Sequence, residues 1–298
     1  MSVTILEAAG AADTEIKPFY FSREHLRALA REHAEAFRQA EPFPHVAIDN
    51  FLPEDVAMRI AHSFPGPFDI DWRLAGPGDT KHTKDPKIEK LSTSDEQKMP
   101  PYIRHVMYGF QSGIFMDFVS RLTGLSHLQP DPSFHGCGLH STGPGGRLMI
   151  HLDASRHPNK DLRQVINCLY YCTPDWDEAW GGHLELWSEK DGKAQECVTK
   201  IAPLFNRLAV FYTGAKSFHG HPRPLTCPQG VRRNSLAIYQ YTTDETQADI
   251  GYTNFVEWAP VTEHDKRSIT HRVKAGIREH LPTGAVNAIA KGVRKFKH

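Results

Sequence analysis

The chain has 298 residues, 40% of them hydrophobic, and its 35 Lys and Arg residues balance 35 Asp and Glu residues. This length suffices for one large β domain or two modules. The zero net charge indicates neither nucleic-acid nor membrane-surface binding. No apolar run approaches the roughly 20 residues of a membrane span, and the first residues lack the basic region and apolar core of a signal peptide.

The cysteines give information about the compartment. There are five of them, which is an odd number, and no Cys-x-x-Cys pair is present. This pattern indicates neither a disulfide framework nor a zinc knuckle. We expect Cys168 and Cys172, which lie in an apolar run, to pack in a buried strand. A reducing, cytoplasmic location is therefore predicted.

Helical periodicity is clearest in the first part of the chain. Residues 22–39 begin with a capping Ser22 and carry apolar residues at helical spacing, so they predict a helix that Pro42 ends. Residues 45–48 predict a strand, and the turn that follows leads into a second helix ending near Ser63.

The next segment contrasts with this pattern. Residues 65–100 are rich in Gly, Pro, Lys, Asp and Ser, and they predict a long polar loop, which is either functional or disordered. Residues 100–123 return to helical spacing and predict one long helix whose aromatic side chains pack against a sheet.

From residue 133 the pattern changes to short apolar runs separated by turn residues, such as the Gly-Pro-Gly-Gly stretch at 143–146. Eight strands are predicted. They span residues 133–140, 147–152, 163–173, 182–188, 196–202, 207–213, 217–221 and 232–242. Many short strands with frequent turns indicate a sandwich or barrel. Eight strands in two facing sheets make a jelly roll, or double-stranded β-helix.

The predicted fold class is therefore mainly β with flanking helices (α+β) around a double-stranded β-helix. We expect residues 1–132 to form a helical region with an entry strand and the polar loop, and residues 133–243 to form the core. Residues 244–298 are expected to add a basic extension with helices at 264–280 and 283–297. All three regions are predicted to form one integrated domain.

A candidate metal site opens the stretch 147–241. His151 and Asp153 are two residues apart at the end of an apolar run, so on a strand they point to the same face. A second imidazole from a distant strand would complete a facial triad, the ligand set of non-haem Fe(II) oxygenases. His219 follows a later apolar run. His221, two residues on, faces the same way, so spacing leaves both open.

A candidate carboxylate anchor begins the last predicted strand. The guanidinium of Arg233 presents a rigid fork that matches a carboxylate, and Ser235 lies on the same face. Arg232 points to the opposite face. Because a register slip of one residue exchanges the faces, the periodicity leaves either arginine open.

Several motifs carry a family resemblance. They are Cys-Leu-Tyr-Tyr-Cys-Thr-Pro-Asp-Trp-Asp (168–177), Gly-Gly-His-Leu-Glu-Leu-Trp (181–187), Phe-Asn-Arg-Leu-Ala-Val-Phe-Tyr (205–212), Ser-Phe-His ending at His219, and Arg-x-Ser at 233–235. Together they resemble the Fe(II)/2-oxoglutarate-dependent dioxygenases of the prolyl 4-hydroxylase type, including the prolyl hydroxylases that act on hypoxia-inducible factor. The resemblance covers about residues 50–243.

The resemblance implies the cofactors and the roles of single residues. Fe(II) would be bound by His151, Asp153 and His219, the last preferred over His221 because Ser-Phe-His matches the distal-ligand position. 2-Oxoglutarate would be bound by Arg233, Ser235 and Tyr171, with O2 as the second cosubstrate. Candidate substrate-pocket residues are His140, Arg163, Asn167 and His221. The loop at about 65–100 would act as a lid over this pocket.

The same resemblance implies the reaction. Because Asp153 is present where halogenating relatives have a small residue, hydroxylation is favoured over halogenation. We expect hydroxylation of an unactivated C–H bond in a small-molecule or carrier-linked natural-product substrate, with succinate and CO2 as coproducts. Prolyl hydroxylation of a protein or peptide is the alternative within the family. A zinc-dependent hydrolase and a non-catalytic cupin-like binding protein are the alternatives of other classes. No nucleic-acid or membrane partner is expected, and the oligomeric state is not predicted.

Overall fold

The computed structural model describes residues 18–74, 90–157, 159–243 and 256–262. The chain divides into two compact units, Met1–Ala259 and Pro260–His298, and all elements below belong to the first. The predicted C-terminal helices, and residues 75–89 of the predicted polar loop, lie outside the described residues. Within the described part, no helix is both long and apolar enough to cross a membrane. The predicted domain boundaries and the cytoplasmic location stay predictions.

The first predicted elements are confirmed. Helix α1 (Arg23–Gln39) begins after Ser22, whose hydroxyl accepts a hydrogen bond from the backbone N–H of His25 at 3.3 Å. Strand β1 (His45–Ile48) and helix α2 (Glu54–Ser63) follow as expected.

The single long helix predicted for residues 100–123 is wrong. The segment forms two helices, α3 (Pro101–Phe110) and α4 (Gly113–Thr123). The break lies at Ser112, whose hydroxyl accepts the N–H of Phe115 and caps α4. A serine side chain that bonds nearby backbone favours a helix start over a helix interior. Both helices bury apolar residues, so the apolar periodicity alone did not reveal the break.

The predicted polar loop is also corrected where the structure describes it. It contains strands β2 (Arg73–Leu74) and β3 (Lys90–Thr93) and the short 3₁₀ helix η1 (Glu96–Lys98). Trp72 is fully buried and its Nε1–H donates to the Gly66 carbonyl at 2.9 Å. Because β3 is paired with a central strand, this end of the segment is part of the sheet and is not a lid.

The remaining strands build the predicted double-stranded β-helix. They are β4 (Leu128–Pro130), β5 (Gly138–Thr142), β6 (Leu148–Leu152), β7 (Arg163–Tyr171), β8 (Leu184–Lys190), β9 (Lys193–Ile201), β10 (Leu208–Tyr212), β11 (His219–His221), β12 (Arg233–Thr242) and β13 (Glu257–Ala259), with the 3₁₀ helix η2 (Glu178–Trp180) before β8. The major sheet has the order β1-β10-β7-β12-β5-β3-β2, with β4 beside β12. The minor sheet has the order β13-β6-β11-β8-β9. All eight predicted strands are present; β2, β3, β4 and β13 were not predicted.

One strand boundary differs for a clear reason. The strand predicted for 133–140 begins only at Gly138, because the preceding residues form a turn. In that turn the buried Asp131 carboxylate accepts the backbone N–H groups of Ser133 and His135. An aspartate that satisfies backbone donors in this way favours a turn over a strand.

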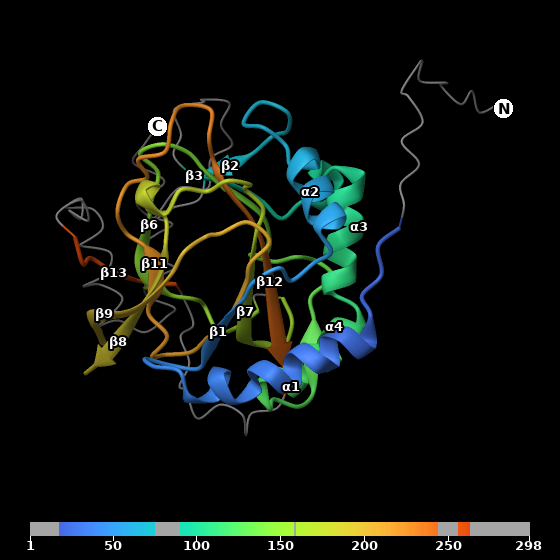
Figure 1. Cartoon of the computed structure of the whole chain (residues 1–298). Helices are drawn as coiled ribbons and strands as arrows, with labels where there is room; N and C mark the ends of the chain where they lie inside the picture. The colour runs from blue at the N-terminus through green and yellow to red at the C-terminus, as the bar shows by residue number, and fades with distance from the viewer. Residues whose placement is uncertain (1–17, 75–89, 158, 244–255, 263–298) are drawn as a thin grey trace, which may run out of the picture. The chain divides into compact units, whose positions relative to one another are not determined.

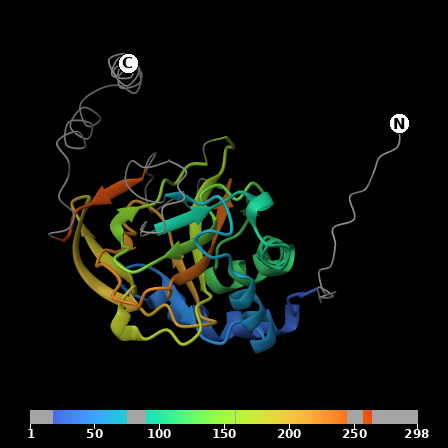
Figure 2. The ribbon, with the colours of Figure 1, turned by 90° about the horizontal axis from the view of Figure 1, so that it is seen from above.

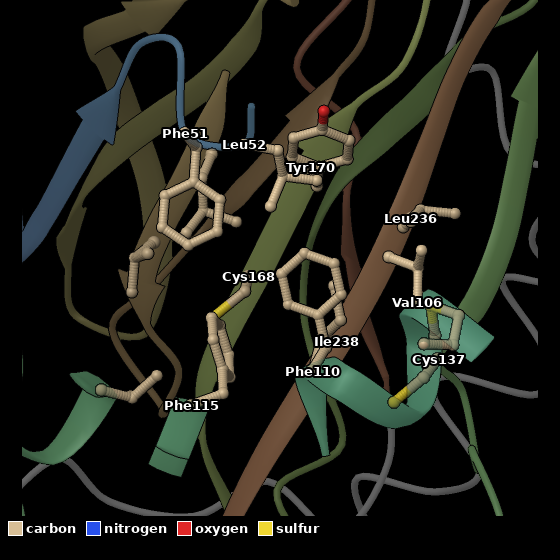
Figure 3. Close-up of a cluster of buried hydrophobic side chains, with 14 of the residues drawn as sticks. Phe51, Leu52, Val106, Phe110, Phe115, Cys137, Cys168, Tyr170, Leu236 and Ile238 are labelled. Carbon is tan, nitrogen blue, oxygen red and sulfur yellow. The ribbon is translucent and has the colours of Figure 1, made fainter. Parts of the chain in front are cut away.

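The two faces of the major sheet pack against different elements. Figure 1 shows α1, α2, α3 and α4 on one side of β7 and β12, and β6, β8, β9 and β11 on the other, and Figure 2 shows the same ribbon from above. On the helical side, Cys168 and Tyr170 of β7 and Ile238 of β12 pack against Phe110 and Phe115 (Figure 3). Cys168 is thus a packing residue as expected, and all five cysteines are free thiols. Because side chains alternate along a strand, the intervening residues face the other sheet.

Candidate active site

The three predicted metal ligands come together between neighbouring strands of the minor sheet. His219 on β11 lies directly opposite His151 on β6, and Asp153 follows the last residue of β6. The Nε2 atoms of His151 and His219 lie 3.3 Å and 3.7 Å from Oδ1 of Asp153. All three side chains are buried, and one ligand atom from each lies within 4.8 Å of the others.

Hydrogen bonds orient both imidazoles. Nδ1 of His151 lies 2.9 Å from the Met149 carbonyl, and Nδ1 of His219 lies 2.8 Å from the Ser217 carbonyl. Because a carbonyl only accepts, each Nδ1 carries the proton and each Nε2 keeps its lone pair. Both lone pairs point toward the same Asp153 oxygen. This donor set fits a divalent cation such as Fe(II), and the carbonyl contacts fix the ring orientation as expected around a metal.

The Asp153 carboxylate is oriented in the same way. Its Oδ2 accepts hydrogen bonds from the amides of Gln164 at 2.9 Å and Asn167 at 3.2 Å, which leaves Oδ1 toward the imidazoles. Burial by itself raises the pKa of Asp153, but His219 and then His151 outweigh it and hold the pKa below its ordinary value. Burial lowers the pKa of His219 to about 4. At neutral pH the Asp153 carboxylate is therefore charged and the His219 imidazole is neutral, the states in which these groups bind a metal.

A β-bulge explains why Gln164 contributes. The pairing of β7 with β12 passes from Ile166 opposite Gln240 to Gln164 opposite Tyr241, so β7 carries one extra residue there. The bulge moves Gln164 to the face of Asn167. The alternation that predicted Arg163 on this face is therefore wrong at that position. Asn167 remains on the predicted face, where it bonds Asp153 rather than facing open space.

The predicted cosubstrate residues share one face of the major sheet. Arg233 is buried; its Nε donates to the Gly182 carbonyl at 2.8 Å and its Nη2 to the Tyr171 hydroxyl at 3.3 Å. The guanidinium also stacks on the Tyr171 ring, 4.9 Å from its centroid. Ser235 lies directly opposite Tyr171. Arg232 instead points to the other face, where its Nε donates to the Ser141 hydroxyl at 2.7 Å.

Arg233 has no acidic partner among the residues that the structure describes. No carboxylate in the described ranges lies within ion-pair distance of its guanidinium. Burial lowers the pKa of the group. An arginine stays charged in proteins, and a buried positive charge is stabilised by an anion close by. The geometry around Arg233 therefore fits a bound carboxylate.

Two further predicted residues face the same region. His140 on β5 lies opposite Ser235 and is half-buried. His221 is buried, and neither of its ring nitrogens has a hydrogen-bond partner within the described part of the chain. Burial, followed by nearby positive charge, holds the pKa of both imidazoles well below the ordinary value.

Sequence reasoning missed two residues of this site, Gln164 and Lys90. Lys90 on β3 is buried and lies close enough to Arg233 and Asp153 to interact with both charges. Its sequence context is a polar segment in which nothing distinguishes it from neighbouring lysines. Gln164 was displaced from the expected face by the bulge. Neither residue had a signal that periodicity could detect.

Comparisons with known proteins give one family match and several similar solved structures. Residues 137–241 match the family model of the 2OG-Fe(II) oxygenase superfamily. No curated protein matches the chain significantly. Similar solved structures include a prolyl hydroxylase from Trichoplax adhaerens in complex with a hypoxia-inducible factor peptide fragment, with 18% identity, a TM-score of 0.49, and coverage of 77% of this chain and 96% of that chain.

Two more solved structures are similar at low identity. A prolyl 4-hydroxylase from Phytophthora capsici has 20% identity and a TM-score of 0.48, and the match covers 78% of this chain and 69% of that chain. HygX from Streptomyces hygroscopicus, solved with nickel and 2-oxoglutarate, has 12% identity and a TM-score of 0.46, with coverage of 76% of this chain and 96% of that chain.

Proposed function

We propose that the 2OG-Fe(II) oxygenase domain of this chain, residues 137–241, binds Fe(II) through His151, Asp153 and His219. The enzyme is a 2-oxoglutarate-dependent dioxygenase and uses Fe(II), 2-oxoglutarate and O2 as cofactor and cosubstrates. When bound, Fe(II) would activate O2, so that one oxygen atom enters the substrate as a hydroxyl group and the other enters the succinate formed, with CO2, from 2-oxoglutarate.

The observation that carries this proposal is the separation of two charged sites on facing sheets. The minor sheet presents a carboxylate and two imidazole lone pairs, and the major sheet presents the buried, unpaired guanidinium of Arg233. A cosubstrate with a keto acid at one end and a carboxylate at the other fits both. In this arrangement Arg233, with Ser235 and Tyr171, binds the far carboxylate.

The remaining residues of the chain have positioning roles in this proposal. Asn167 and Gln164 hold Oδ2 of Asp153, so that Oδ1 is presented to the metal. The carbonyls of Met149 and Ser217 hold the imidazole protons away from it. Such contacts fix ligand orientation and typically change metal affinity about 10–100-fold when removed.

We infer that the substrate is a small molecule or a carrier-linked molecule hydroxylated at an unactivated carbon. Polar side chains near the triad and Arg233, namely Lys90, His140 and His221, are buried or half-buried. Such an enclosed polar surface favours a compact polar ligand. A peptidyl proline is the second candidate, which a prolyl peptide tests directly by succinate release.

A zinc-dependent hydrolase is the main alternative of another class, since two histidines and a carboxylate also suit catalytic zinc. Such an enzyme has no need of a buried carboxylate-binding arginine. The unpaired Arg233 therefore favours the oxygenase.

The test is an anaerobic titration. Purified protein receives Fe(II) and then 2-oxoglutarate, and the visible spectrum is recorded. We expect a weak charge-transfer band in the visible range, because a keto acid then chelates ferrous iron. The band is lost in His151→Ala. In Arg233→Gln the affinity for 2-oxoglutarate falls about 30–100-fold, the value of a charge-assisted bidentate contact.

Arg232→Gln is the matched control, since it removes the same group from the adjacent residue on the opposite face. It is expected to bind 2-oxoglutarate within about threefold of the wild type, because the removed charge points away from the site. No band, together with tight zinc binding, would refute the oxygenase assignment. A loss of affinity in Arg232→Gln rather than Arg233→Gln would refute the assignment of the anchor.

A further inference from the structure

A row of three polar side chains crosses the inner face of the major sheet. Thr142 on β5 lies directly opposite Arg233 on β12 and, on its other side, directly opposite Lys90 on β3. Residues directly opposite one another in an antiparallel sheet project to the same face, and neighbouring strands lie about 4.8 Å apart. Lys90 therefore projects from the same face as Arg233, two strands away with Thr142 between them, and this face also carries Tyr171 and Ser235.

Within the described ranges, Lys90 and Thr142 have no side-chain hydrogen-bond partner. Lys90 is only 8% exposed, and within the described ranges no group accepts a hydrogen bond from its ammonium. Thr142 is fully buried, and its hydroxyl also lacks a hydrogen-bond partner among those residues. A buried lysine is rarely left unpaired. Burial, and then the positive charge of Arg233, lower the pKa of Lys90 to about 7, while Asp153 opposes the change.

In the proposed complex, the positive and negative charges balance without Lys90. Fe(II) and Arg233 are balanced by the Asp153 carboxylate and the two carboxylates of 2-oxoglutarate. Lys90 then adds a positive charge that none of these groups neutralises. Because a buried charge is stabilised by a partner of opposite sign, an anionic group next to Lys90 would favour its ammonium form in the complex.

We propose that Lys90 and Thr142 form a specificity-determining subsite that binds an anionic group, a carboxylate or phosphate, of the primary substrate. This inference rests on the proposed function, because it assigns the two carboxylates of 2-oxoglutarate to the metal and to Arg233. An ammonium acts as a compact point charge for either anion, and the Thr142 hydroxyl donates a second hydrogen bond. The substrate is thus an anionic molecule whose charged group lies beside the cosubstrate.

The test uses small anions as probes. Protein loaded with Fe(II) and 2-oxoglutarate without oxygen receives acetate, inorganic phosphate or the neutral acetamide, and binding is followed by calorimetry and by the visible band. We expect saturable binding of acetate or phosphate and none of acetamide. Lys90→Met weakens anion binding at least about tenfold, as for the loss of a charged hydrogen bond. Thr142→Val weakens it about threefold, and Lys90→Arg keeps it within about threefold.

A 2-oxoglutarate titration of the same variants shows whether Lys90 binds the carboxylate of the primary substrate or that of 2-oxoglutarate. It also shows whether the variants are correctly folded. Lys90→Met is expected to bind 2-oxoglutarate within about fivefold of the wild type, because the lost charge acts only through space. A loss equal to that of Arg233→Gln would overturn the proposal and assign Lys90 to the cosubstrate. The proposal would also be overturned if the charge-transfer band forms but the wild type binds no anion, or if Lys90→Met binds the anion as tightly as the wild type. Absence of the band itself would instead refute the proposed function.

Discussion

Gly182 supports Arg233, and its replacement by alanine tests the proposed cosubstrate site without removing a charged group. Gly182 has a φ of +73°, and a Cβ added there would lie 2.8 Å from Cδ2 of Leu225 and 2.9 Å from Cδ of Arg233. The Gly182 carbonyl also accepts the Nε–H of Arg233 at 2.8 Å. The methyl group must therefore displace the arginine side chain that its own carbonyl holds.

The size of the effect follows from these contacts. A side chain at positive φ costs about 1–2 kcal/mol. Ordinary van der Waals contact begins at 3.4 Å, so the Arg233 stem must move by several tenths of an ångström. Misaligning a charge-assisted contact costs about 1.5–3 kcal/mol, which corresponds to roughly 10–100-fold in the dissociation constant of 2-oxoglutarate.

Gly181→Ala is the matched control. Gly181 also has a positive φ, +79°, but a Cβ there meets nothing within 4 Å. Both variants should lose stability in thermal unfolding, because both place a side chain in a strained backbone conformation. In the anaerobic titration, Gly181→Ala should bind 2-oxoglutarate within about threefold of the wild type, because it leaves Arg233 in place. Equal losses in both variants, or unchanged binding in Gly182→Ala, would refute the reasoning.

Three more predictions follow from buried polar contacts. Gln164→Leu removes one of the two amides that hold Oδ2 of Asp153 and should weaken Fe(II) binding about 10–100-fold in an equilibrium titration. Asn206→Ala leaves three hydrogen-bonding groups of Leu52 and Tyr170 unsatisfied and should lower the free energy of unfolding by about 3–5 kcal/mol, whereas Tyr170→Phe removes one bond and costs about 1 kcal/mol. Asp131→Asn breaks a fully buried carboxylate cluster and should cost about 2–4 kcal/mol in denaturant unfolding. Burial raises the pKa of Asp131, but its hydrogen bonds, first from Lys160, outweigh this and hold the pKa below its ordinary value. Its stabilisation is therefore present above the unfolded-state pKa of about 3.9 and is lost as the pH falls further, so the stability difference between wild type and Asp131→Asn should narrow there.

Each of these predictions can fail on its own. Unchanged Fe(II) affinity in Gln164→Leu would mean that Asn167 alone orients the carboxylate. Equal losses in Tyr170→Phe and Asn206→Ala would contradict the count of hydrogen bonds around Asn206. A stability difference for Asp131→Asn that stays constant at acidic pH would show that the charge of this carboxylate contributes nothing to folding.

Local patterns were enough for much of this protein. A capping serine and helical spacing located α1, and alternation between turn residues located the eight core strands. The spacing of His151 and Asp153 placed two ligands on one side of a strand because side chains alternate with a period of two. The motif around Arg233 and Ser235 chose between two adjacent arginines that periodicity could not separate. All of these signals lie within a few residues of one another in the chain.

Long-range pairing decided the rest. The register of β11 places His219, and not His221, directly opposite His151, a contact between residues far apart in the sequence. The bulge in β7 exchanges Gln164 for Arg163, because one extra residue reverses the alternation of a strand. Lys90 enters the site only because β3 pairs with β5 and so aligns it with Thr142 and Arg233. No short stretch of sequence encodes these register choices, since they depend on how distant strands bury their shared faces.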